Sequence, residues 1–251
     1  MAGFVSAVQH YALECGHPAL PRGHTYRSVR AGLDNWYGDT NFSQPKQGIT
    51  IDDLCEFRSH LVASDFADAR DWCACLFAFY GLLRVREYTC GGLRVMDVAS
   101  HHWGVSLTIP FSKTSLVPTT IDIIRRDDQL CPLVALRSYL ALVPAGVHAP
   151  HLPFFLASPL SSSPLLDTQF IRRVRTLVRT ALHRDPRSYS GHSFRRGGTT
   201  ALLLAGVPEA TIASHGRWKS LAYRGYLDVQ HNRRLRLAAT AQLSLNTARV
   251  N

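Results

Sequence analysis

Two stretches early in the chain carry apolar residues at helical spacing. Residues Ile51 to Ala63 and Ala67 to Leu83 both show this period and predict helices. Thr50 is typical of a helix N-terminus, where a side-chain oxygen accepts a backbone N–H. The acidic residues that follow it are also typical, because negative charge is favourable at this end of a helix. The second stretch is apolar on nearly every face, so we expect that helix to lie at the centre of the core.

Between Val95 and Ile124 the apolar spacing changes to alternation. The runs VSLTIPF and LVPTTIDII are rich in β-branched residues and are joined by SKTS, which predicts a small antiparallel sheet with Lys113 at a hairpin tip. Helical spacing returns from Pro132, interrupted by a proline-rich loop and by FFLA, which we interpret as a short strand. The predicted fold class is mostly α with a small antiparallel β-sheet (α+β).

The first 45 residues have their own pattern. Two helices are predicted, over residues 1–15 and about 25–37, and GDTNFSQPKQG then breaks all periodicity, as an interdomain linker does. We therefore expect a small helical domain with its linker in residues 1–45 and a larger domain in residues 46–251. Because the first helix begins almost at Met1, we expect the small domain to lack its earlier part.

The composition is that of an ordinary globular protein, with 46% hydrophobic residues. No run of eighteen apolar residues occurs, and charge and histidine interrupt the opening segment, where a signal peptide would be apolar. We therefore expect a soluble intracellular protein without a membrane partner. The six cysteines lack paired C-x-x-C spacing, so we expect reduced core thiols and no metal site.

The net charge of +10 makes a polyanion the first partner to consider. Of the 28 basic residues, 25 are arginine. The planar guanidinium matches pairs of phosphate oxygens, whereas lysine is a point charge. An arginine-rich genome produces the same bias, so the charge gives only weak support for nucleic acid as the partner.

Two pairs of residues could carry chemistry, although each has a more ordinary explanation by itself. Arg84 follows a buried helix and has Glu87 three residues later, which on its own favours a structural ion pair. His192 and Arg195 would share one face of a helix near its N-terminus, an end that attracts anions. A lone His-x-x-Arg is common, and by itself it is better explained by helix capping with solvation.

A third group lies in HGRWKSLAYRGYLDV, which contains Trp218, Tyr223 and Tyr226. Tyrosine has a pKa of about 10, so it becomes a good nucleophile only where cations and a proton acceptor surround it. For any single tyrosine, aromatic packing is the more ordinary interpretation.

The order of these groups along the chain resembles the tyrosine recombinase family. The matching segments are LLRVREYTCGGLRVMDV, SKTSLV, GHSFRRG and GRWKSLAYRGY, within residues 46–245. The preceding helices resemble the end of that family's core-binding domain. The segment GHSFRRGGTTALLLAGVPEATIASHGRWKS is most similar to recombinases of Crypton and DIRS-like mobile elements, including fungal DNA breaking-rejoining enzymes.

The resemblance implies a site-specific recombinase or integrase of a mobile element, which cuts and rejoins DNA through a 3′-phosphotyrosyl intermediate. It implies no cofactor, because the covalent intermediate conserves the bond energy without ATP or metal. The catalytic residues carried over from the family are Arg84, Lys113, His192, Arg195, Trp218 and the nucleophile Tyr226.

Each of these residues has an implied role. The two arginines would bind the free phosphate oxygens, the lysine would protonate the departing 5′-oxygen, and the histidine would accept the phenolic proton or bond to the phosphate. The tryptophan would support the site, and Glu87 would orient the first arginine or the histidine. Because Trp218 and Tyr226 are one residue closer together than in many bacterial members, Tyr223 remains an alternative nucleophile.

Further basic residues are expected to contact double-stranded DNA. Arg172, Arg175 and Arg179 mark one face of a helix whose opposite face is apolar, and Arg196 and Lys219 are also assigned to DNA. The final segment HNRRLRLAATAQLSL predicts a basic amphipathic helix, which in this family often docks on a neighbouring protomer. We therefore expect a homodimer or tetramer on DNA, in the nucleus. Packing of this helix on its own chain is an equal alternative.

Three other functions remain open at this point. A decayed or domesticated element copy would bind DNA without cleaving it, and a type IB topoisomerase would use the same phosphotyrosine chemistry without site preference. A metal-dependent nuclease could use the twelve histidines and the pair His101 and His102, but the sequence has no clustered Asp/Glu set to support it.

Overall fold

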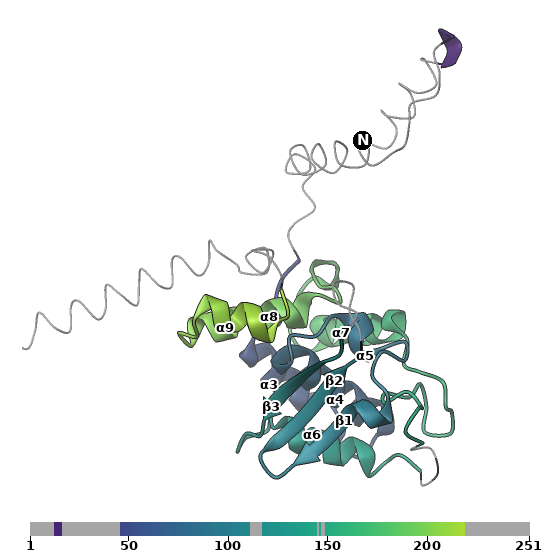
Figure 1. Ribbon diagram of the computed structural model, residues 1–251, viewed down its shortest axis with the longest axis vertical. Coiled ribbons are helices and arrows are strands. Elements are labelled where there is room, and N and C mark those ends of the chain that lie inside the picture. The colour runs from purple at the N-terminus through teal and green to yellow at the C-terminus, as the bar shows by residue number, and fades with distance from the viewer. Residues whose placement is uncertain (1–12, 17–45, 111–116, 145, 147–148, 219–251) are drawn as a thin grey trace, which may run out of the picture. The chain divides into compact units, whose positions relative to one another are not determined.

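Figure 1 shows the computed structural model of the chain, which describes residues 13–16, 46–110, 117–144, 146 and 149–218. The chain divides into two compact units, Met1–Pro45 and Lys46–Asn251. In the first unit, the described residues are the end of a helix and a turn at Gly16. The two helices predicted there lie almost entirely outside the described residues, so a core-binding domain stays a prediction.

The described part of the second unit is mostly helical, with one small sheet, and it confirms the predicted fold class. Its α-helices are α3 (Ile51–Ser59), α4 (Phe66–Tyr80), α5 (Val85–Tyr88), α6 (Pro132–Leu140), α7 (Asp167–Thr180), α8 (Ser193–Leu204) and α9 (Glu209–His215). The shorter elements are the 3-10 turns η2 (Val95–Asp97) and η3 (Pro186–Ser188) and the strands β1 (Val98–His101), β2 (Gly104–Ile109) and β3 (Thr119–Ile124).

Helix α3 begins as the sequence predicts. The Thr50 hydroxyl accepts the Asp53 N–H at 3.1 Å, and the Asp53 carboxylate accepts the Thr50 N–H at 2.9 Å, so each satisfies a donor of the other. The helix ends at Ser59, earlier than the predicted Ala63. Beyond this end, the Val62 N–H donates to the Asp68 carboxylate at 3.0 Å, outside any helical ladder.

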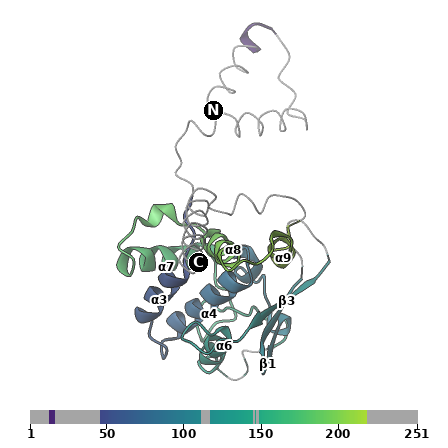
Figure 2. The ribbon, with the colours of Figure 1, turned by 90° about the vertical axis from the view of Figure 1, so that its left-hand side faces the viewer.

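Helix α4 forms the centre of the core, as predicted from its apolar surface. Every residue from Asp68 to Phe79 is buried. In Figure 2, α4 lies between α6 and α8, and it contacts both. A helix covered on all faces holds its C-terminus in a fixed place, and the candidate site is built around that end.

The sheet is antiparallel in the order β1-β2-β3, with Leu107 opposite Val98 on one side and Ile121 on the other. One face, which includes Val105 and Ile123, is buried in the core. The FFLA segment does not form the predicted strand: the pairings at and beside it among the described residues are the isolated bridges Arg94–Pro153 and Leu156–Pro164.

Two consecutive glycines let α8 approach its neighbours closely. A Cβ atom on Gly198 would lie 2.2 Å from the Phe79 carbonyl oxygen, and one on Gly197 would lie 1.6 Å from the Ile49 carbonyl oxygen. These contacts press α8 against the last turn of α4 and against the segment before α3. Arg195, which precedes the glycines on α8, is thereby brought to the C-terminal end of α4.

The cysteines follow the prediction only in part. All six are free thiols. Cys73, Cys75 and Cys131 are buried, but Cys15 and Cys90 are exposed and are therefore not core residues. Across the described ranges, the structure contains no helix of the length and apolar character that crossing a bilayer requires.

Candidate active site

The site is built on the C-terminal end of α4. Gly81 caps the helix, and Leu82 follows in the left-handed region with φ 47°. The Leu83 N–H returns to the Ala78 carbonyl at 3.0 Å and closes the turn. The carbonyl groups beyond this turn, those of Tyr80, Gly81 and Leu82, point away from the helix, and this end of the helix carries partial negative charge.

Three basic side chains from α8 and from the end of α9 satisfy these carbonyl groups. The His215 Nε2 lies 2.7 Å from the Tyr80 oxygen, and Arg217 donates through Nη1 to the Gly81 oxygen at 3.3 Å. Arg195 donates through Nη1 to the Leu82 oxygen. Cations at a helix C-terminus are stabilised by its dipole, which favours the two arginines at the end of α4.

Arg195 lies between two helix ends and is completely buried. Its Nη2 donates to the Gly216 oxygen at 2.6 Å, at the end of α9. The Trp218 ring lies against it, with 3.9 Å between the guanidinium carbon and the ring centroid. Carbonyl oxygens and an aromatic face together stabilise a charge that would otherwise be very unfavourable to bury.

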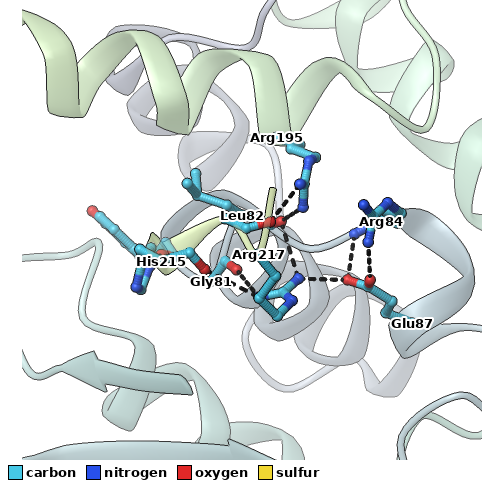
Figure 3. Close-up of polar contacts among 9 residues, drawn as sticks. Gly81, Leu82, Arg84, Glu87, Arg195, His215 and Arg217 are labelled. Carbon is cyan, nitrogen blue, oxygen red and sulfur yellow. Dashed lines mark hydrogen bonds and ion pairs between the residues drawn. The ribbon is translucent and has the colours of Figure 1, made fainter. Parts of the chain in front are cut away.

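A second cluster joins Arg84, Glu87 and Arg217, as Figure 3 shows. Arg84 Nη1 donates to Glu87 Oε1 at 2.8 Å, and Arg217 Nη2 donates to Oε2 at 2.7 Å. The Arg84 backbone N–H also donates to Oε2, at 2.8 Å. The Glu87 side chain is 5% exposed and that of Arg84 is 21% exposed, so Arg84 is the member of this pair that solvent reaches.

His192 stands directly before α8 and is exposed at the surface. Partial desolvation of its ring lowers the pKa of His192, and the positive charges of Arg195, Arg84 and Arg196 lower that pKa further. The imidazole is therefore neutral at neutral pH, the form that can accept a proton. This charge coupling places His192 in the field of both candidate catalytic arginines.

The structure thus brings together five of the residues singled out from the sequence: Arg84, Glu87, His192, Arg195 and Trp218. Lys113, Lys219, Tyr223 and Tyr226 lie outside the described residues. Sequence reasoning did not single out Arg217 or His215. Their only signal is that HGRW places basic residues on both sides of a helix-ending glycine.

A groove lined by arginines runs along α7. Its volume is about 510 Å³, and Arg172, Arg175, Arg179 and Arg187 line it together with Thr168 and Ile171. The opposite face of α7 is buried through Phe170, Val174, Leu177 and Val178, so the helix has the two faces that the sequence predicts. Ile171 also lies 3.4 Å from the position of a Cβ on Gly191, beside His192, so the groove adjoins the candidate site.

Arg196, one of the predicted DNA contacts, does not line the groove of α7. It lines a separate groove of about 340 Å³ with Gly48, Ile51, Thr200 and Leu204. Among the residues that the structure describes, no three His, Cys, Asp or Glu side chains gather as a metal site. His101 stacks on Trp103 with ring centroids 4.6 Å apart, and its Nε2 lies 3.1 Å from the Ser106 hydroxyl.

The fold is that of the tyrosine recombinase catalytic domain. The XerH site-specific recombinase, in a post-cleavage complex with palindromic difH substrate, matches with TM-score 0.57 and 16% identity over 79% of this chain and 53% of that chain. The Tn1549 transposon integrase, in complex with circular intermediate DNA, matches with TM-score 0.52 and 14% identity over 89% of this chain and 80% of that chain. The present chain spans about half of the XerH chain. No protein-family model and no curated protein matches the sequence.

Proposed function

We propose that this protein is a site-specific DNA recombinase or integrase that cleaves and rejoins DNA through a 3′-phosphotyrosyl intermediate. One observation carries the proposal: three arginines gather at the end of α4, where Arg84 and Arg217 bind the Glu87 carboxylate and Arg195 and Arg217 both donate to the Leu82 oxygen. Three guanidinium groups and one carboxylate leave a formal charge of +2, and His192 beside them is neutral. Such a cluster suits a phosphate that gains negative charge during reaction.

In the proposed first step, the Tyr226 oxygen attacks phosphorus while its proton passes to His192, and a tyrosyl–phosphate bond forms as the bond to the 5′-oxygen breaks. Lys113 gives its proton to the departing 5′-oxygen. Arg84 and Arg195 bind the two free phosphate oxygens, where each charge-assisted bond contributes about 1.5–3 kcal/mol. Rejoining runs the same step backwards, with a 5′-hydroxyl as the nucleophile.

Arg195 must rearrange before it can take this role. Its guanidinium is completely buried beneath Trp218 and donates to two backbone carbonyls. A phosphate oxygen reaches it only if the Trp218 ring moves or if an N–H leaves its carbonyl partner. In this proposal DNA binding drives that exchange, because a phosphate is a stronger acceptor for guanidinium than a neutral carbonyl.

The proposed DNA path includes the arginine groove of α7. Arg172, Arg175 and Arg179 are exposed along one face, spaced to follow a phosphate backbone. Arg187 pairs with Asp185 at 3.0 Å, so its charge is partly neutralised. In this proposal Arg196 and Lys219 add further DNA contacts, and the substrate is double-stranded DNA. The protein acts as a dimer or tetramer for a Crypton or DIRS-like element.

The burial of Arg195 also supports a second candidate, a DNA-binding remnant without catalytic activity. If the Trp218 cover never opens, the phosphate keeps only one of its two catalytic arginines. The groove of α7 would still bind DNA, because it does not involve Arg195. Binding and cleavage therefore have to be measured separately.

Covalent trapping distinguishes the two candidates without a known target site. Wild-type protein is incubated in EDTA with duplexes that carry a randomised region and nicks, so that cleavage releases a short fragment and traps the adduct. The proposed function predicts an SDS-resistant, protease-sensitive adduct with an enriched DNA sequence. DNA binding without an adduct would indicate the remnant, and adducts without sequence enrichment would indicate a topoisomerase.

A further inference from the structure

Arg217 occupies a backbone position that favours glycine. Helix α9 ends at Gly216, and the N–H groups of Arg217 and Trp218 return to the carbonyls of Ser214 and Ala213, both at 2.9 Å. This hydrogen-bond pattern requires a left-handed residue after the cap, and Arg217 adopts it with φ 58°. A side chain is strained in this conformation, so the contacts of the Arg217 side chain have to outweigh the strain.

Those contacts are extensive. The Arg217 side chain is only 9% exposed and donates to the Gly81 oxygen and to the His215 oxygen, both at 3.3 Å. Its strongest interaction is the 2.7 Å ion pair with Glu87. Desolvation lowers the pKa of Arg217, and the Glu87 carboxylate offsets part of this effect, so the ion pair keeps the buried guanidinium charged.

Arg217 affects both the orientation of the Glu87 carboxylate that binds Arg84 and the net charge around Arg84. Both carboxylate oxygens of Glu87 are occupied, Oε1 by Arg84 and Oε2 by Arg217 and by the Arg84 N–H. A carboxylate bonded on both sides cannot rotate away from its partner. An Arg84–Glu87 pair alone would be neutral, whereas the group of three keeps a positive charge that can act on a phosphate at the partly exposed Arg84.

We propose that Arg217 is a positioning residue for the cleavage step: it locks the Glu87 carboxylate that holds Arg84, and it anchors to this carboxylate the segment that leads to Tyr226. The inference rests on the proposed function. Arg217 acts through Glu87 and does not touch the reacting atoms. A role of this kind affects the rate of cleavage more than the affinity for DNA.

The test compares Arg217→Gln, Arg217→Lys and Arg217→Gly in single-turnover cleavage of a trapped target, with DNA affinity measured in parallel. Arg217→Gln is expected to slow cleavage by about 10- to 100-fold, the scale for residues that orient a catalytic group, with DNA affinity changed by less than about threefold. Arg217→Lys keeps the charge and is expected to recover a measurable part of the rate. Arg86→Gln is the matched control, because Arg86 lies in the same helix α5 as Glu87 but is 81% exposed and pairs only with Asp167 among the described residues.

The glycine variant separates the side chain from the backbone. Arg217→Gly relieves the left-handed strain, so it is expected to melt about 2–4 °C above Arg217→Gln while cleaving no faster. Combining Arg217→Gln with Glu87→Gln should slow cleavage no more than the slower single change, because both remove the same interaction. A wild-type cleavage rate in Arg217→Gln would overturn the positioning role of Arg217 and leave the proposed function standing. Fully additive losses in the double variant would do the same. If wild type forms no adduct, the proposed function fails and this inference fails with it.

Discussion

The Trp218 ring lies 3.9 Å from the Arg195 guanidinium, measured from the guanidinium carbon to the ring centroid. Trp218 also packs against the apolar cluster of Leu82, Leu203 and Ile212, which restricts the ring. An indole face is the aromatic surface that binds cations best, and the strength of the interaction grows when water is excluded. Trp218 therefore stabilises the charge of Arg195 and at the same time covers the Arg195 guanidinium.

Gly216→Ala tests the position of this cover. Gly216 has φ −79°, which any residue adopts, so the change adds only bulk. The new Cβ would lie 1.7 Å from the Trp218 ring, which has to move. We expect an unfolding free energy lower by about 1–3 kcal/mol, the usual effect of overpacking, measured by chemical denaturation. Ser214→Ala, at an exposed position of the same helix, is the control, and an unchanged free energy for Gly216→Ala would contradict this placement of Trp218.

Gly198→Ala tests the approach of α8 to α4. Alanine in a helix is usually favoured over glycine by roughly 1 kcal/mol, so a solvent-facing position would gain stability. Here the Cβ would lie 2.2 Å from the Phe79 oxygen and 2.6 Å from a Leu82 methyl group. We expect the clash to outweigh the higher helix propensity of alanine, so the thermal midpoint should fall. Thr200→Ala on the same helix should leave the midpoint close to that of wild type. A rise in the midpoint for Gly198→Ala would show that α8 lies farther from α4.

The lowered pKa of His192 gives a pH prediction. If the neutral ring accepts the phenolic proton, cleavage slows as pH falls through this pKa, because the imidazolium cannot accept. The pKa is depressed, so this decline begins below the usual range for histidine. Arg196→Gln removes one of the charges that lower it, and the acid limb should therefore move to higher pH. The pH–rate profile and an NMR titration of the imidazole check this together. An acid limb at the same pH as in wild type would exclude His192 as the acceptor.

The three exposed arginines of α7 give a salt-dependence prediction. Removing one arginine that binds a phosphate should reduce the slope of log affinity against log salt by about 1. Changing Arg172, Arg175 and Arg179 to glutamine, singly and then together, should reduce the slope stepwise and to a similar extent on all DNA sequences. Arg137→Gln, at an exposed position of α6, is the control. Slopes equal to wild type in the triple variant would remove α7 from the DNA path.

Most of the fold could be predicted from the sequence, because periodicity reports which faces are buried. The uniform apolar surface of α4 and the alternation in β2 and β3 are strong signals of this kind. The prediction of a strand at FFLA was wrong because a short apolar run does not distinguish a strand from a buried loop that pairs only at isolated positions. The prediction that Cys90 is a core thiol was wrong because it came from the spacing and composition of the cysteines. It took no account of the local turn in which Cys90 lies.

The candidate site was less predictable for a different reason. Arg84 and Glu87 are close in sequence, so helical geometry alone suggests their ion pair. The ion pair of Arg217 with Glu87 joins residues 130 positions apart, and it exists because α4 and α9 both end at the same place. The left-handed turns at Leu82 and Arg217 create the carbonyl acceptors that hold Arg195 and Arg217. A non-glycine residue in this conformation leaves no mark in the hydrophobic pattern.

Phosphotyrosine chemistry at Tyr226 can be checked by mapping the residue that carries the trapped DNA. Arg224 lies between the two candidate tyrosines, so trypsin separates them into SLAYR and GYLDVQHNR. After nuclease digestion of the adduct, mass spectrometry should find the nucleotide on GYLDVQHNR, and Tyr226→Phe should abolish the adduct while DNA binding persists. A nucleotide on SLAYR, or an adduct that survives Tyr226→Phe, would contradict the account.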